Sequence, residues 1–184
     1  PSTYCSERLW VDVPAKSRAA DTVSELAAPF GKLWGAVRFA DLMRAPYGPP
    51  VRLNPLTERL ISEGTLDRAK EVRQRQAHSG WPRVNMLHEQ AVQRRRGVLA
   101  DVCLRPLADL FGKVAKGSAR WDAWKALHTE RGWPWLGEDR DCPDWVWLPE
   151  AEAGDYPSEL ERARAAVARF EAAHEAIQHK DAAE

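Results

Sequence analysis

The clearest structural signal in this chain is an apolar stripe near its C-terminal end. Between residues 157 and 184, side chains with an apolar face recur at alternating steps of three and four, at Leu160, Ala163, Val167, Phe170, His174 and Ile177. This spacing places them along one side of an α-helix. Ser158 and Glu161 form a capping box at the start, in which each side chain bonds the other residue's backbone N–H. The segment therefore predicts a long helix that packs against one partner helix.

Similar periodicity predicts helices through most of the rest of the chain. They are expected at residues 22–28, with a cap at Asp21 or Thr22, at 31–44, at 84–104, and at 118–129, where Ser118 is the cap and Gly132 the stop. Two short helices between residues 56 and 75 turn at Gly64. Four prolines in residues 45–55 favour an extended connector, because proline disfavours helix in the residue before it.

These elements predict an all-α fold, a bundle of about five to seven helices. We divide the chain into an N-terminal arm with helices and the Pro-rich connector (1–54), a helical core (55–131), a Trp/Pro/acidic segment (132–156) and the C-terminal helix (157–184). At 184 residues the chain suits one compact domain overall.

The Trp/Pro/acidic segment contains a near-repeat of the form W-x-W-L-x-E. Its members are Trp133, Trp135, Trp145 and Trp147, and alternate residues of an extended chain share a face, so a short β-hairpin would gather four indoles. Such a platform could contact a base, a sugar or a proline-rich peptide; the competing interpretation is that the indoles close the core. The acids nearby would repel phosphate, which favours a protein partner at these four residues, or at Val167 and Phe170 of the final helix.

Charge is balanced overall but not along the chain. The net charge is zero, yet residues 68–96 hold eight Lys/Arg against two Asp/Glu, and residues 137–161 hold nine Asp/Glu with only Arg140 as a base. The basic residues expected to contact the phosphates of DNA or RNA are Arg68, Lys70, Arg73, Arg75, Arg94, Arg95 and Arg96. Residues 56–75 have only partial helix-turn-helix character, and the competing interpretation of the whole region is a solvated basic face.

No catalytic or metal-binding pattern is present in the sequence. His174-Glu175 is followed by His179, one residue too late for the zinc motif H-E-x-x-H, and Cys5, Cys103 and Cys142 are too far apart for a zinc ribbon. We therefore expect no metal, no cofactor and no catalytic residues. An enzyme whose site assembles from distant residues, such as His78, His88, His128 or Cys103, stays open as a lesser alternative.

The sequence thus predicts a non-enzymatic accessory subunit of a nucleic-acid-handling complex, with a protein partner as well. The alternative is a pure protein-interaction or regulatory module, for example a homodimer through the stripe between Leu160 and Ile177. Three scattered cysteines favour a reducing compartment, and the absence of a signal-peptide pattern and of a membrane span favours the cytoplasm.

Overall fold

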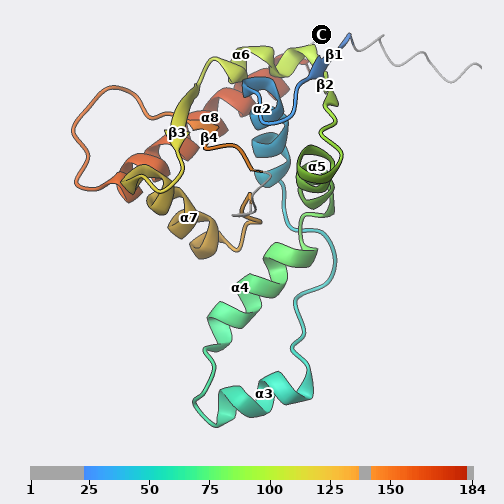
Figure 1. Cartoon of the computed structure of the whole chain (residues 1–184), viewed down its shortest axis with the longest axis vertical. Helices are drawn as coiled ribbons and strands as arrows, with labels where there is room; N and C mark the ends of the chain where they lie inside the picture. The colour runs from blue at the N-terminus through green and yellow to red at the C-terminus, as the bar shows by residue number, and fades with distance from the viewer. Residues whose placement is uncertain (1–22, 137–141, 182–184) are drawn as a thin grey trace, which may run out of the picture.

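The computed structural model describes residues 23–136 and 142–181, and Figure 1 shows the chain path. The described elements are, in order, β1 (Ser24–Ala27), α2 (Lys32–Leu42), α3 (Pro55–Ser62), α4 (Arg68–Ser79), α5 (Pro82–Gln93), β2 (Val98–Asp101), the 3-10 helix η1 (Val102–Leu104), α6 (Arg105–Ala108), β3 (Phe111–Ala115), α7 (Ala119–Arg131), β4 (Trp145–Pro149) and α8 (Glu159–Asp181). The first 22 residues of the predicted N-terminal region, with the helix cap at Asp21 or Thr22, and the acids at 138, 139 and 141 lie outside the described residues.

The predicted all-α class is wrong, because the mostly helical chain also forms two antiparallel sheets of two strands each. β1 pairs with β2, with Ser24 opposite Asp101, and β3 pairs with β4, with Phe111 opposite Pro149. Each strand has only four or five residues, and each partner lies far away in the sequence. Local periodicity cannot reveal such pairs, since their stability comes from a distant strand.

Three of the predicted elements change as a result. Residues 24–27 form a strand instead of a helix, and the helix predicted over 84–104 ends at Gln93. Gly97 then passes so close to β1 that a Cβ on it would lie 2.4 Å from the Ala27 carbonyl oxygen. The predicted tryptophan hairpin is also wrong, because β4 pairs with β3 and residues 133–136 form no strand.

The other predicted helices are confirmed, and Ser118, Gly132 and Ser158 cap or end theirs as predicted. The Ser118 hydroxyl accepts the Trp121 N–H, and Gly132 ends α7 with a left-handed φ of 64°. The Ser158 hydroxyl accepts the Glu161 N–H at the start of α8. Gly64, with φ 74°, makes the turn between α3 and α4.

The core is built around α2, in which every residue from Trp34 to Leu42 is buried. The Phe39 ring meets Phe111, Trp124 and Phe170 edge to face, at centroid distances of 5.6 to 5.8 Å. The apolar stripe of α8 faces this core and α7. The middle of the stripe is thus covered within the chain, Leu160 and Ile177 at its ends are partly buried, and the homodimer considered above stays a prediction.

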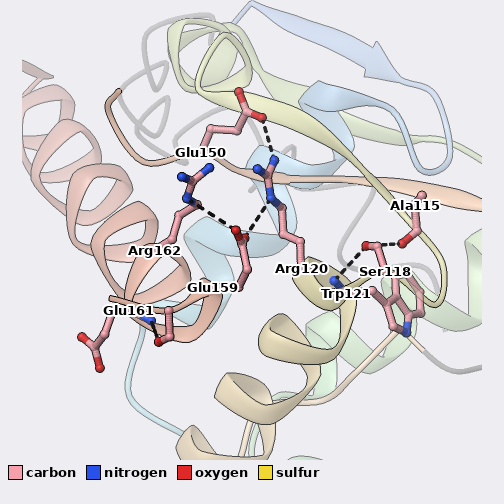
Figure 2. A network of polar contacts seen from close by, with 9 residues as sticks. Ala115, Ser118, Arg120, Trp121, Glu150, Glu159, Glu161 and Arg162 are labelled. Carbon is pink, nitrogen blue, oxygen red and sulfur yellow. Dashed lines mark hydrogen bonds and ion pairs between the residues drawn. The ribbon is translucent and has the colours of Figure 1, made fainter. Parts of the chain in front are cut away.

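An ion-pair network joins the starts of α7 and α8 to the end of β4 (Figure 2). Arg120 contacts Glu150 at 3.5 Å and Glu159 at 3.3 Å, and Arg162 lies 3.8 Å from the other oxygen of Glu159. All four side chains are partly exposed, so the pairs contribute little each. They join α7 and α8 at the protein surface, at the edge of the contact between the two helices.

Helices α3 and α4 form an arm that projects from this body (Figure 1). Neither helix has a buried residue. The connector after α2 leads out to α3, and α4 returns to the body at α5. No helix in the described residues is both long and apolar enough to cross a bilayer.

Candidate nucleic-acid interface

Helix α4 carries three basic residues that have no carboxylate partner among the described residues. Asp67 caps the helix by accepting the Lys70 N–H. Within the described residues, Arg68 is paired with Glu58, whereas Lys70, Arg73 and Arg75 form no ion pair. Three positive charges therefore remain uncompensated along one helix, which is the electrostatic requirement for binding a polyanion.

Two clefts lie between α4 and the segment that follows α7, and Trp135 lines both of them. The first, of about 290 Å³, is lined by Lys70 and Arg73 opposite Trp133 and Trp135. The second, of about 810 Å³, is lined by Arg75 and other α4 residues opposite the same Trp135. The half-buried Trp135 indole thus lines both clefts, and α4 contributes Lys70 and Arg73 to the first and Arg75 with Glu71 to the second.

Two further clefts continue around the end of α4 toward the root of the arm. One, of about 410 Å³, shares Arg75 with the second cleft and adds Arg52 and Tyr47 from the connector. The other, of about 540 Å³, shares Tyr47 and lies against Arg44 and Arg83. We call these four neighbouring clefts the α4 groove. Its acidic residues are Asp41 and Glu71, and its basic ones are Arg44, Arg52, Lys70, Arg73, Arg75 and Arg83.

A buried arginine fixes residues 133–135, which form the side of the groove opposite α4. Arg38, on α2, is 1% exposed, and its Nη2 donates to the Pro134 carbonyl at 3.0 Å and bonds His128 Nε2 at 2.8 Å. Its Nε donates to His88 Nε2 at 2.8 Å. His128 in turn packs against the Trp135 ring at 4.8 Å. The backbone next to Trp135 is therefore fixed by α2 and α7 rather than by a neighbouring strand.

This network sets the protonation of its members. Burial lowers the pKa of Arg38 to about 9, so the guanidinium stays charged at neutral pH. Burial, and then the Arg38 charge, hold the pKa of His128 and of His88 well below the usual value. Both imidazoles are therefore neutral and can accept from Arg38 through Nε2, while the His128 Nδ1–H donates to the Trp124 carbonyl.

The same pKa shifts predict a loss of stability in mild acid. As the pH falls below the unfolded value of about 6.5, the unfolded chain takes up a proton that the buried His128 cannot, so the free energy of unfolding decreases by up to about 1.4 kcal/mol per pH unit. His88 adds to this slope in the same direction. Above pH 7 this contribution is constant. Urea unfolding from pH 7.5 to 5 measures it, and a flat profile would contradict the neutral histidines.

Gly132 brings α4 and α7 close together at the first cleft. A Cβ on this residue would lie 3.3 Å from the Arg73 carbonyl oxygen, and its φ is left-handed. Both properties favour glycine here. The glycine that ends α7 therefore also sets the width of the groove.

The sequence-predicted phosphate contacts divide into two groups. Lys70, Arg73 and Arg75 line the α4 groove, and Arg68, on the same helix, is paired with Glu58. Arg94, Arg95 and Arg96 follow the far end of α5 and line none of the four clefts, and Arg94 pairs with Glu89. The structure therefore separates residues that the sequence analysis grouped together.

The predicted partner-binding residues lie in three different settings. Trp133, Val167 and Phe170 are buried in the core. Trp135 is part of the groove wall. Trp145 and Trp147 share the outer face of β4, where the ammonium groups of Lys113 and Lys32 cover their rings at 4.0 and 4.6 Å. The four indoles thus form no common platform.

Other residues of the groove were missed in the sequence. Arg52 and Tyr47 belong to the Pro-rich connector, which we interpreted only as a linker, and Arg44 directly precedes it. The signal available there was an arginine and a tyrosine among prolines that cannot form a core helix.

The residues considered for a metal site or an assembled active site lie in separate parts of the described structure. Among the described residues, no group of three His, Cys, Asp or Glu side chains is placed to hold a metal ion. Of the four residues considered for a distant active site, His88 and His128 bond Arg38 inside the protein. His78 lies in the groove, and Cys103 belongs to η1.

Comparison of the chain with models of protein families, with curated proteins and with solved structures gave no match. Function is therefore inferred from the groove itself.

Proposed function

We propose that this chain is a non-enzymatic, cytoplasmic subunit that binds single-stranded DNA or RNA in the α4 groove as part of a nucleic-acid-handling complex. The observation that carries the proposal is the set of unpaired cations Lys70, Arg73 and Arg75 facing Trp135 across two clefts. Alternating positive and aromatic side chains suit a single strand, because phosphates meet the cations while bases contact rings.

The shape of the groove favours a single strand over a duplex. Its clefts hold about 290 to 810 Å³ each and share lining side chains such as Trp135 and Tyr47. In a duplex the bases are paired and stacked inside the helix, so they cannot enter these clefts. Single-stranded bases are free to turn into them.

The exposed arm supports a protein partner as the second half of the proposal. Leu56 on α3 is 66% exposed on a helix that has no buried residue. We assign the partner contact to α3 because the helix projects from the body and none of its residues is buried. According to this proposal, α4 binds the nucleic-acid strand and α3, at the far end of the arm, binds the protein partner.

A salt titration tests the nucleic-acid half. We expect fluorescence anisotropy of a labelled oligonucleotide of about ten residues to show binding to the full chain at low ionic strength. The logarithm of the association constant should fall linearly with that of the salt concentration, by about 0.7 for each phosphate neutralised. No binding to DNA or RNA at low salt would overturn the proposal and leave the pure protein-interaction module.

A further inference from the structure

The first cleft of the α4 groove, of about 290 Å³, is positively charged. Lys70 and Arg73 line it and no aspartate or glutamate does, whereas the second cleft includes Glu71. His128, from α7, also lines it but offers no free polar atom, because both of its ring nitrogens are bonded inside the protein. The charge of this cleft therefore suits an anion.

Two side chains that line this cleft have a buried N–H group without a hydrogen-bond partner among the described residues. The groups are Arg73 Nε–H and Trp135 Nε1–H. Each can only donate, so what each lacks is an acceptor, and leaving such groups unpaired is costly. A phosphate supplies several acceptor oxygens and also a negative charge for Lys70 and Arg73. A neutral carbonyl would leave both cations uncompensated.

A third positive charge lies directly behind the cleft. Arg38 bonds His128 Nε2 at 2.8 Å and is 1% exposed. Its Nη1 is buried without a hydrogen bond, and within the described residues it forms no ion pair. Burying a guanidinium without a carboxylate is costly, and an anion in the adjoining cleft offsets part of that cost.

This cleft is also the end of the α4 groove. It shares Gln74, Ala77 and Trp135 with the second cleft and no lining residue with the other two. Gly132 lines it as well, and there α7 meets α4, since a Cβ on Gly132 would lie 3.3 Å from the Arg73 carbonyl oxygen. A strand that follows the four clefts therefore reaches the contact between α4 and α7 at this point and ends.

We infer that this cleft holds the terminal phosphate of the bound strand, with Arg73 and Trp135 as hydrogen-bond donors and Lys70 as a second cation. A phosphate monoester has three acceptor oxygens and a charge of about −2 at neutral pH. A phosphodiester inside the strand carries only about one negative charge, so it would satisfy the donors and cations less fully. This inference rests on the proposed function, since the phosphate arrives as part of the strand.

The test compares oligonucleotides of one sequence that end in a 5′-phosphate, in a 3′-phosphate, or in hydroxyl groups at both ends. We expect a phosphate at one of the two ends to tighten binding to the full chain about tenfold, because it forms charge-assisted hydrogen bonds. A hydroxyl-ended strand that is longer by one nucleotide controls for charge. It adds a phosphodiester but no monoester, and it should bind within about twofold of the shorter strand.

Arg73→Gln and Arg75→Gln are a matched pair of variants. Each removes one positive charge from α4, but only Arg73 lines this cleft. We expect Arg73→Gln to reduce the preference for the phosphorylated end to about twofold or less. Arg75→Gln should weaken phosphate-ended and hydroxyl-ended strands alike and keep the tenfold preference.

Trp135→Phe tests the second donor, because it keeps an aromatic ring and removes the N–H. The preference for the phosphorylated end should fall in this variant too. Thermal unfolding checks that each variant folds. If Trp135→Phe does not fold, the two arginine variants carry the test, since α4 has no buried residue.

Equal affinity of the wild type for all three kinds of strand end would overturn the terminal-phosphate site and leave strand binding intact. A preference that survives in both Arg73→Gln and Trp135→Phe would overturn it as well. If inorganic phosphate raises the unfolding temperature of the wild type but not of Arg73→Gln, and no end preference is seen, the cleft binds a free anion instead. No binding of any strand would remove the proposed function.

Discussion

Glutamine at Lys70, Arg73 and Arg75 together is expected to weaken single-strand binding on the order of 100-fold at low salt. The three side chains are the unpaired cations of α4, and they line the two clefts that Trp135 also lines. If each neutralises one phosphate, the slope of log K against log salt should become shallower by about 2. Anisotropy titrations at four or more salt concentrations measure both quantities. Because all three positions are outside the core, the fold should be retained.

The matched control removes three positive charges elsewhere. Arg59, Arg94 and Arg96 are exposed and line none of the four clefts, and the first two belong to local ion pairs. Glutamine at these positions gives the same net charge as the groove variant. We expect less than a threefold loss of affinity and a nearly unchanged slope. Equal losses in the two variants would mean that overall charge, and not the α4 groove, binds the strand.

Methionine at Arg38 is expected to lower the free energy of unfolding by about 3 kcal/mol. The substitution leaves the Pro134 carbonyl and two imidazole nitrogens without their donor. Part of this loss is offset because the buried guanidinium no longer needs desolvation, which is why the expected value is less than the sum of three lost bonds. Urea denaturation at pH 7.5 gives the difference from wild type.

Two comparisons make the Arg38 result specific. Arg169→Met removes a partly exposed arginine that lies 3.9 Å from Glu152, and it should cost less than about 1 kcal/mol. The Arg38 variant should also lose less stability in mild acid, because burial still lowers the pKa of His128 and His88 but the Arg38 charge, the second cause, is gone. Wild-type stability in Arg38→Met would show that the network does not hold the groove wall.

The helices were predictable because their signals are local. Ser118, Gly132 and Ser158 cap or end their helices through bonds within a few residues, which the sequence displays directly. The strands were not predictable in this way. Ser24–Ala27 pairs with residues more than seventy positions later, and nothing in four residues of sequence indicates that partner.

The candidate site was predictable only in part, for a related reason. The sequence identifies α4 as basic, but it cannot tell that Glu58 pairs with Arg68 while Lys70 has no carboxylate partner. It also groups α4 with Arg94–Arg96, although a twelve-residue helix separates them. Asp41 lies on α2 and Trp81 directly precedes α5. They line one cleft only because the chain returns to α2 after α3 and α4, so this cleft depends on tertiary structure.

Ultraviolet crosslinking of a bound oligonucleotide, followed by mass-spectrometric mapping of the modified peptides, tests the groove most directly. It uses the unaltered chain and reports contact instead of affinity. The groove predicts crosslinks within residues 45–52, 68–79 and 133–136, which hold Tyr47, α4 and Trp135. Crosslinks confined to residues 94–101, or to the outer face of β4 at Trp145 and Trp147, would place the strand elsewhere and contradict the account.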